Sequence, residues 1–144
     1  MNLYNEIFRR KSFHRFTNTI PFSDSDLNLI NETIASVKPL DKNIKTKLLL
    51  VKENLTSCKL GSEYCILFYS EKKDFYLENI GYIGEQIDLI LTKNNIGTLW
   101  CGLGKTKNNI NEKFNDVFSN FRKVDEEFLE ELEEALIMSD IGIE

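Results

Sequence analysis

One amphipathic helix between two apolar runs constrains the fold of this 144-residue chain more than any other feature. Apolar side chains within residues 76–95 recur at the spacing of one helix face; they are Ile80, Ile83, Ile87, Ile90 and Leu91. The runs YCILFYS at 64–70 and IGTLWCG at 96–102 are typical of buried strands. We therefore predict a strand–helix–strand unit in which the helix packs on a sheet.

Shorter signals before this unit predict two more helices and one more strand. Leu3, Ile7 and Phe8 recur at helical spacing, so a short helix is expected over residues 2–10. A second helix begins after Ser23, whose side chain forms a capping box with Asp26, and ends before Pro39. Residues 48–51 (LLLV) are expected to form a strand.

Two glycines in the helix at 76–95, Gly81 and Gly84, lie three residues apart on nearly the same face. Glycine in a helix interior costs about 1 kcal/mol relative to alanine. We expect close approach of another backbone or of a ligand there, with simple tolerance of glycine as the alternative.

Composition indicates an ordinary globular chain, with 42% apolar residues, 28% charged residues and a net charge of -5. The apolar runs are too short for a membrane span, and the N-terminus carries no signal-peptide pattern. The three cysteines, Cys58, Cys65 and Cys101, are unpatterned and fit reduced thiols. We expect a cytoplasmic protein with no metal site, no nucleic-acid partner and no integral membrane segment.

The acidic residues are concentrated at the C-terminus: residues 105–144 hold five basic and eleven acidic side chains. The apolar pattern there predicts two helices, the second capped by Asp125. The two stripes comprise Ile110, Phe114, Val117, Phe118 and Phe121, then Phe128, Leu129, Leu132, Leu136 and Ile137. This acidic hairpin is expected to pack on the sheet or on another subunit, because its apolar surface exceeds what a lone hairpin buries.

The motif GLGKT at 102–106 resembles the end of a phosphate-binding P-loop. A P-loop requires a glycine five residues before the Gly-Lys-Thr, where this chain has Leu99. Trp100 and Cys101 also continue the alternation of the preceding strand. We reject nucleotide binding at this motif.

A second anion-binding signal is RRKSFHRF at residues 9–16. Arg10, Lys11 and His14 supply cationic or N–H donors and Ser12 a hydroxyl, a set that can hold a phosphate by charge-assisted hydrogen bonds. The alternative is a basic last turn that complements the dipole of the first helix.

The stretches FRRKSFHRFTNTIPFSDSDLNLINETI (8–34) and NIGYIGEQIDLILTKNNIGTLWCGLG (79–104) resemble the N-terminal half of FMN-dependent nitroreductases. The segment VKPLDKNIKTKLLLV (37–51) resembles the larger, internally duplicated nitroreductase subfamily of anaerobic bacteria. The resemblance implies FMN as cofactor, NAD(P)H as electron donor if the protein is active, and a homodimer. It places the FMN contacts on Arg10, Lys11, Ser12 and His14. Because the flavin carries the hydride chemistry, no catalytic residue is nominated.

This chain departs from the nitroreductase pattern in ways that leave enzyme activity open. His14 stands where the family has Arg or Lys, and the Pro-Ser-x-x-Asn-x-Gln-Pro-Trp segment that cradles the flavin ring is absent. The expected fold is α+β: a truncated nitroreductase-like helix/sheet sandwich over residues 1–104, followed by the acidic two-helix hairpin over 105–144. Two functions remain as alternatives: an FMN-binding oxidoreductase and a non-enzymatic scaffold.

Residues 102–144 resemble the start of the N domain of the bacterial signal recognition particle receptor. In that family a Gly-Leu-x-Lys-Thr opening starts a helix, and a second, acidic helix ends in a motif that ALIMSDIGIE (135–144) matches. The resemblance implies a truncated or chimeric protein whose tail is a fragment of a targeting GTPase and carries no chemistry alone. The alternative is a divergent nitroreductase with an acidic tail of its own.

Overall fold

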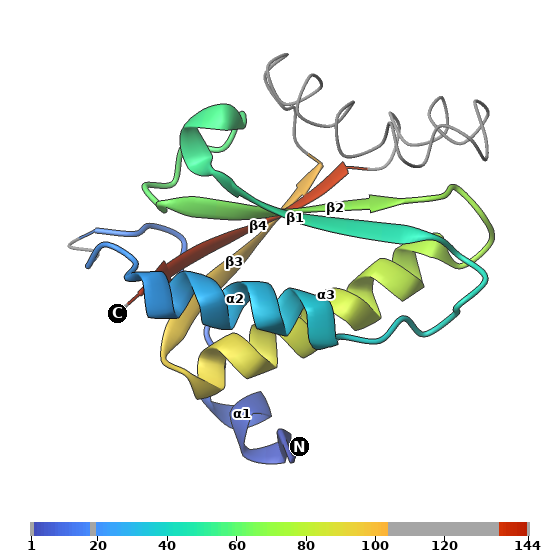
Figure 1. The fold of residues 1–144 in the computed structure, drawn as a ribbon, viewed down its shortest axis with the longest axis horizontal. Coiled ribbons are helices and arrows are strands. Elements are labelled where there is room, and N and C mark those ends of the chain that lie inside the picture. Colours follow the sequence, from blue (N-terminus) through green and yellow to red (C-terminus); the bar gives the residue numbers. More distant parts are fainter. Residues whose placement is uncertain (1, 18–19, 104–135, 144) are drawn as a thin grey trace.

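The computed structural model describes residues 2–17, 20–103 and 136–143, which form an antiparallel sheet with helices on one face (Figure 1). The strands lie in the order β1-β2-β4-β3, and every neighbouring pair is antiparallel. The helices are α1 (Tyr4–Arg9), α2 (Asp24–Ser36), the short 3-10 helix η1 (Glu53–Leu55) and α3 (Tyr76–Lys93). The strands are β1 (Thr46–Lys52), β2 (Tyr64–Ser70), β3 (Ile96–Leu103) and β4 (Leu136–Ile143).

The elements predicted between residues 2 and 102 are confirmed. Ser23 and Asp26 form the capping box of α2: the Ser23 side chain accepts from the Asp26 N–H, and the Asp26 carboxylate accepts from the Ser23 N–H at 2.8 Å. The helix ends at Ser36, ahead of Pro39. The strand over 96–103 begins at Ile96 and includes the residues that exclude a P-loop at 99–101.

The core lies on both faces of β2. Side chains of Ile66 and Phe68 meet the helices, where they join a buried cluster completed by Ile30, Ile80, Ile83, Ile87, Leu91 and Ile96. The alternate residues of β2 point to the other face, where Cys65, Leu67 and Tyr69 form a second buried cluster. A strand buried on both faces explains why the run YCILFYS is almost continuously apolar.

Gly84 is required by the packing of α3 on the sheet, whereas Gly81 is not. A Cβ at Gly84 would lie 2.1 Å from an atom of the Trp100 ring, which itself stacks on Phe68. A Cβ at Gly81 would meet nothing within 4 Å. A close approach therefore occurs at Gly84, but the approaching group is an indole and not the backbone or ligand that we expected. At Gly81 the alternative holds, simple tolerance of glycine.

Strand β4 corrects the helical prediction for Leu136 and Ile137, which form backbone pairs with β2 and β3. The physical reason is that β2 and β3 both present backbone donors and acceptors, which an intervening strand satisfies. The run also holds several isoleucines, which favour strands. The rest of the acidic hairpin, with its packing and the domain boundary near Gly104, lies outside the described residues.

No helix among residues 2–17 and 20–103 is long and apolar enough to cross a membrane.

Candidate functional site

The basic segment, residues 9–16, is hydrogen-bonded to β3 and to the loop after η1. Ser12 forms an isolated bridge with Thr98, and the Phe13 N–H donates to the Thr98 carbonyl at 3.1 Å. The Phe13 ring packs on Gly97, where a Cβ would lie 2.7 Å from the ring. Further along, the Phe16 N–H donates to the Leu60 carbonyl at 3.1 Å. These contacts hold residues 12–16 between β3 and the loop after η1.

Arg10 fixes the start of this segment through a buried carboxylate. Its Nε donates to Asp88 on α3, a residue only 2% exposed. Asp88 also accepts from the Thr98 hydroxyl and from the Trp100 indole N–H, the latter at 3.3 Å. One buried carboxylate therefore joins the segment after α1, α3 and β3.

The charge around Arg10 is more than neutralised. Glu85 lies 3.9 Å from the same guanidinium Nε, so two carboxylates face one cation. Burial, and next the nearby negative charge of Asp88, raise the pKa of Glu85, an effect that Arg10 only partly offsets. We infer that Arg10 attracts an anion less strongly than an unpaired arginine would.

The other three predicted residues, Lys11, Ser12 and His14, are exposed on the segment that Arg10 anchors. Lys11 forms no ion pair within 2–17, 20–103 or 136–143 and lines an open pocket of about 100 Å³. Phe13, Thr92, Asn95, Ile96, Gly97 and Arg9 complete the lining. Of the four predicted residues, the structure brings only Lys11 to this pocket.

Sequence reasoning missed Arg9 as a pocket residue. Its Nη1 pairs with Glu6 at 2.9 Å and its Nη2 donates to Asn95 at 3.2 Å. The sequence RRKSFHRF begins with two arginines, and only the second of them, Arg10, is among the predicted phosphate ligands. Because Glu6 and Asn95 both bind its guanidinium, we interpret Arg9 as a structural part of the pocket wall.

This pocket can accommodate only the phosphate end of FMN. Small-molecule sites usually enclose about 300–1,000 Å³, so a pocket of about 100 Å³ accommodates a phosphate-sized group but no flavin ring. The Lys11 ammonium at its lining suits an anionic group. In the part of the chain that the structure describes, no cluster of three or more potential metal ligands occurs.

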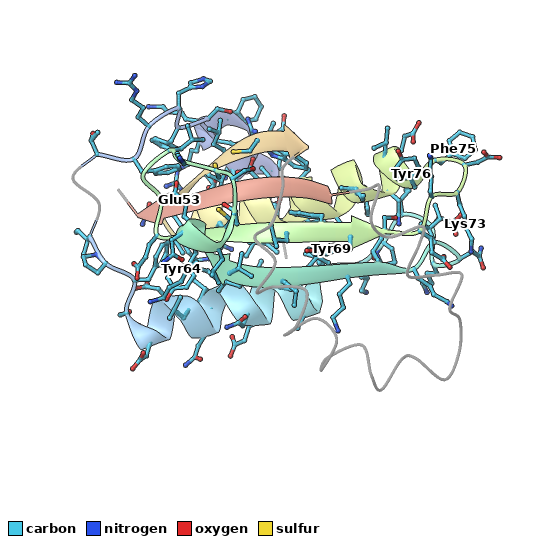
Figure 2. The ribbon with its side chains drawn as sticks, turned by 90° about the horizontal axis from the view of Figure 1, so that it is seen from above. Glu53, Tyr64, Tyr69, Lys73, Phe75 and Tyr76 are labelled. Carbon is cyan, nitrogen blue, oxygen red and sulfur yellow. The ribbon has the colours of Figure 1, made fainter. Side chains whose placement is uncertain are left out.

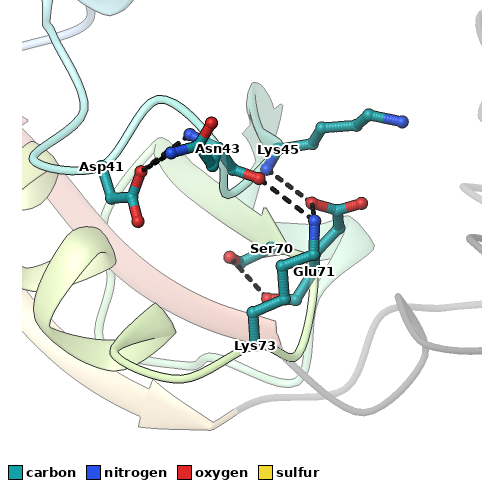
Figure 3. Close-up of polar contacts among 6 residues, drawn as sticks. All are labelled: Asp41, Asn43, Lys45, Ser70, Glu71 and Lys73. Carbon is teal, nitrogen blue, oxygen red and sulfur yellow. Dashed lines mark hydrogen bonds and ion pairs between the residues drawn. The ribbon is translucent and has the colours of Figure 1, made fainter.

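A second polar cluster, also missed, lies at the far end of the sheet around Glu71 (Figure 3). The carboxylate accepts from the Lys45 N–H at 2.8 Å and pairs with the Lys73 ammonium at 2.9 Å. Burial raises the pKa of Glu71, but these two contacts outweigh it and leave the pKa below its usual value. Lys73 also donates to the Asn43 carbonyl, so the cluster joins two loops.

The two polar regions lie at opposite ends of the sheet (Figure 2). Glu53 lies near the end that carries the basic segment, and Lys73 lies near the opposite end. Because Glu71 and Lys73 neutralise each other and bind backbone groups, we interpret the far cluster as structural.

The family model described as "Putative TM nitroreductase" matches residues 2–136. The chain belongs to this nitroreductase family. The match includes the basic segment, α3 and β3, so the network around Asp88 lies within the family region.

Solved nitroreductases share the fold. A nitroreductase with bound FMN from Desulfitobacterium hafniense DCB-2 superposes with a TM-score of 0.63 at 18% identity, covering 99% of this chain and 89% of that one. An FMN-dependent nitroreductase from Clostridium difficile R20291 gives 0.63 at 14% identity, covering 96% and 85%. A nitroreductase family protein from Clostridium novyi NT gives 0.57 at 19% identity, covering 99% and 85%.

A short part of the chain also matches the signal recognition particle receptor FtsY. The receptor of Bacillus subtilis (strain 168) is 58% identical over 41 residues, 28% of this chain and 12% of the receptor. That of Metamycoplasma hominis is 44% identical over 54 residues, 38% of this chain and 15% of the receptor. The chain thus spans less than a sixth of these receptors. The resemblance to both families is confirmed, whereas truncation and chimeric origin stay predictions.

Proposed function

We propose that this chain binds FMN and holds the flavin phosphate on the segment after α1. The observation that carries the proposal is the exposed Lys11, which lines a phosphate-sized pocket on a backbone segment that is hydrogen-bonded to Thr98. Ser12 and His14 are exposed on the same segment. Similar folds include a nitroreductase with bound FMN and FMN-dependent nitroreductases. The pocket beside Lys11 then receives the phosphate end.

Within this proposal Arg10 has two roles. Its Nε positions the segment through Asp88. Its Nη groups have no hydrogen-bond partner among the described residues, so we propose that they contact a phosphate that extends beyond the pocket beside Lys11. Because Asp88 and Glu85 face the guanidinium, we expect Lys11 to contribute more of the attraction for the phosphate.

The flavin ring needs more walls than the pocket beside Lys11 provides among the described residues, since that pocket encloses only about 100 Å³. We propose that a second copy supplies them. Three large apolar side chains of α1 are exposed to solvent: Tyr4 by 64%, Ile7 by 54% and Phe8 by 73%. Such a patch is typical of a protein interface, and α1 leads directly into the basic segment.

Bound FMN would supply hydride transfer from NAD(P)H to an acceptor. In this proposal the basic segment binds and orients the phosphate and transfers no proton. Oxidoreductase activity therefore depends on a complete binding site for the flavin ring.

Titration of the purified full chain with FMN tests the proposal. Lys11→Ala should weaken binding about ten- to hundredfold, because it removes one charged hydrogen bond. Ser12→Ala should weaken it less, and Lys42→Ala, which removes an exposed lysine of a distant loop, should leave it unchanged. Equal affinities for Lys11→Ala and Lys42→Ala would refute the phosphate assignment.

Light scattering tests the second copy. The account predicts a particle of twice the 16.8 kDa chain mass, reduced to the monomer mass by Phe8→Glu, which places a charge in the α1 patch. A wild-type monomer that still binds FMN would contradict the shared site.

The alternative function is a non-enzymatic scaffold that carries a fragment of a targeting receptor. It is favoured by the 58% identity over 41 residues, compared with 19% or less for the solved nitroreductases reported above. A colourless protein that neither binds added FMN nor oxidises NAD(P)H would support this alternative.

A further inference from the structure

The thiols of Cys58 and Cys101 lie close together although the residues are far apart in the sequence. Their Sγ atoms are 3.6 Å apart across a separation of 43 residues. Cys58 belongs to the loop between η1 and β2, and Cys101 belongs to β3. Both side chains are half-buried, packed beside the Cys65 cluster on the sheet face opposite α2 and α3.

Strand β3 directs Cys101 to this face. Its neighbour Trp100 packs on α3, whereas Cys101 packs against the Cys65 cluster on the opposite face of the sheet. The pairing with β4 shifts between Trp100 and Gly102, which leaves Cys101 as the additional residue of a bulge. Gly102 takes a φ of 69°, as glycine readily does. Bulges re-aim side chains, so Cys101 is presented toward the loop.

The loop that carries Cys58 is held in place by its own hydrogen bonds. The Glu53 carboxylate accepts from the N–H groups of Leu60 at 2.7 Å and Gly61 at 2.9 Å. The Cys58 N–H donates to the Thr56 hydroxyl at 3.1 Å. A loop tied at both ends keeps the Cys58 thiol beside β3 without requiring a covalent bond.

We propose that Cys58 and Cys101 form a reversible intramolecular disulfide by exchange with a low-molecular-weight disulfide. One cysteine thiolate attacks the small disulfide, forms a mixed disulfide and releases one small thiolate. The second cysteine thiolate then attacks the protein sulfur of that mixed disulfide and displaces the other small thiolate. The two cysteines lose two electrons and their protons, and the small disulfide is reduced to two thiols. The sulfurs must approach from 3.6 Å to about 2.05 Å.

The bond would brace the basic segment from two sides. The loop of Cys58 receives the Phe16 N–H on the Leu60 carbonyl, and the strand of Cys101 receives the Phe13 N–H on the Thr98 carbonyl. A disulfide between the loop and the strand would therefore covalently link the two elements that accept hydrogen bonds from Phe13 and Phe16. This inference does not require that a flavin binds there.

Cys65 is the matched control within the same cluster. It is fully buried and its Sγ lies 3.7 Å from the Thr56 hydroxyl. Since exchange requires access of the small disulfide to a thiolate, Cys65 should not react.

The test uses the full chain and oxidised glutathione as the probe, with peptide mapping by mass spectrometry under non-reducing conditions. The expected result is a Cys58–Cys101 cross-linked peptide, a fall from three reduced thiols to one, and full reversal by dithiothreitol. Cys65→Ala should still form the cross-link. Cys58→Ser and Cys101→Ser should each carry a glutathione adduct on the remaining partner.

Three outcomes would overturn the proposal: separate glutathione adducts on Cys58 and Cys101 in the wild type, a cross-link that includes Cys65, or no reaction under native conditions. Because the decisive measurement is made on the wild-type chain, it stands even if a variant fails to fold. Amide hydrogen exchange gives a second readout, with slower exchange at Phe13 and Phe16 expected in the oxidised protein.

Discussion

The guanidinium of Arg10, just after α1, donates to the buried carboxylate of Asp88 in the middle of α3. The two residues are 78 positions apart, and the same carboxylate accepts from Thr98 and Trp100 of β3. The basic segment that we assign to phosphate binding is therefore positioned from the hydrophobic core. Loss of Asp88 should affect stability first and ligand binding second.

Asp88→Asn should lower the free energy of unfolding by about 2–4 kcal/mol, because it leaves the guanidinium of Arg10 without its buried counter-charge while keeping the side-chain size. Urea denaturation followed by circular dichroism measures this. Glu85→Gln is the matched control. It removes the more exposed carboxylate near the same guanidinium, and because the pKa of Glu85 is raised by burial, this variant should be neutral or stabilising. Equal destabilisation by both variants would contradict the assigned geometry.

Gly84→Ala and Gly81→Ala should change stability in opposite directions. The alanine methyl at 84 collides with the Trp100 ring at 2.1 Å, so we expect a loss of about 1–3 kcal/mol from overpacking. At 81 the methyl meets open space, and replacing a helical glycine should stabilise by about 0.5–1 kcal/mol. The same urea experiment on both variants checks the register of α3 against β3. A Gly84→Ala variant as stable as the wild type would show that the Trp100 ring does not lie against residue 84.

Glu71 should make stability fall at acidic pH. Its pKa is below the usual 4.5 in the folded chain, because the Lys45 N–H and the Lys73 ammonium outweigh the effect of burial. The folded state therefore favours the charged carboxylate, and the stabilisation is complete above pH 4.5 and is lost as pH falls through the lowered pKa. Glu71→Gln should be less stable than the wild type at neutral pH, and the difference should shrink in acid. A difference that stays constant with pH would refute this ionic role.

Much of the fold was predictable from periodicity and end signals. The stripe of Ile80, Ile83 and Ile87 identified α3, and the pairing of Ser23 with Asp26 identified the start of α2. These signals act within one element, so a single sequence suffices to detect them. Gly84 was predictable as a close approach, but not the indole that approaches it.

The contacts that build the site were not predictable in the same way. The partnership of Arg10 with Asp88 depends on how α1 and α3 pack, which no local pattern specifies. Strand β4 was read as helix at Leu136 and Ile137 because these residues continue the spacing of the acidic segment before them. A short apolar run does not distinguish strand from helix by periodicity alone, and the free edges of β2 and β3 decide it.

The measurement that tests the central claim most directly compares FMN with riboflavin, which differ only in the phosphate. Fluorescence titration of the wild-type chain should give a Kd for FMN at least about tenfold below that for riboflavin, because only FMN carries the phosphate that we assign to Lys11 and the basic segment. Lys11→Ala should narrow this ratio. Equal affinities for the two flavins, or no binding of either, would contradict the account and leave the nitroreductase motif as a feature of the fold alone.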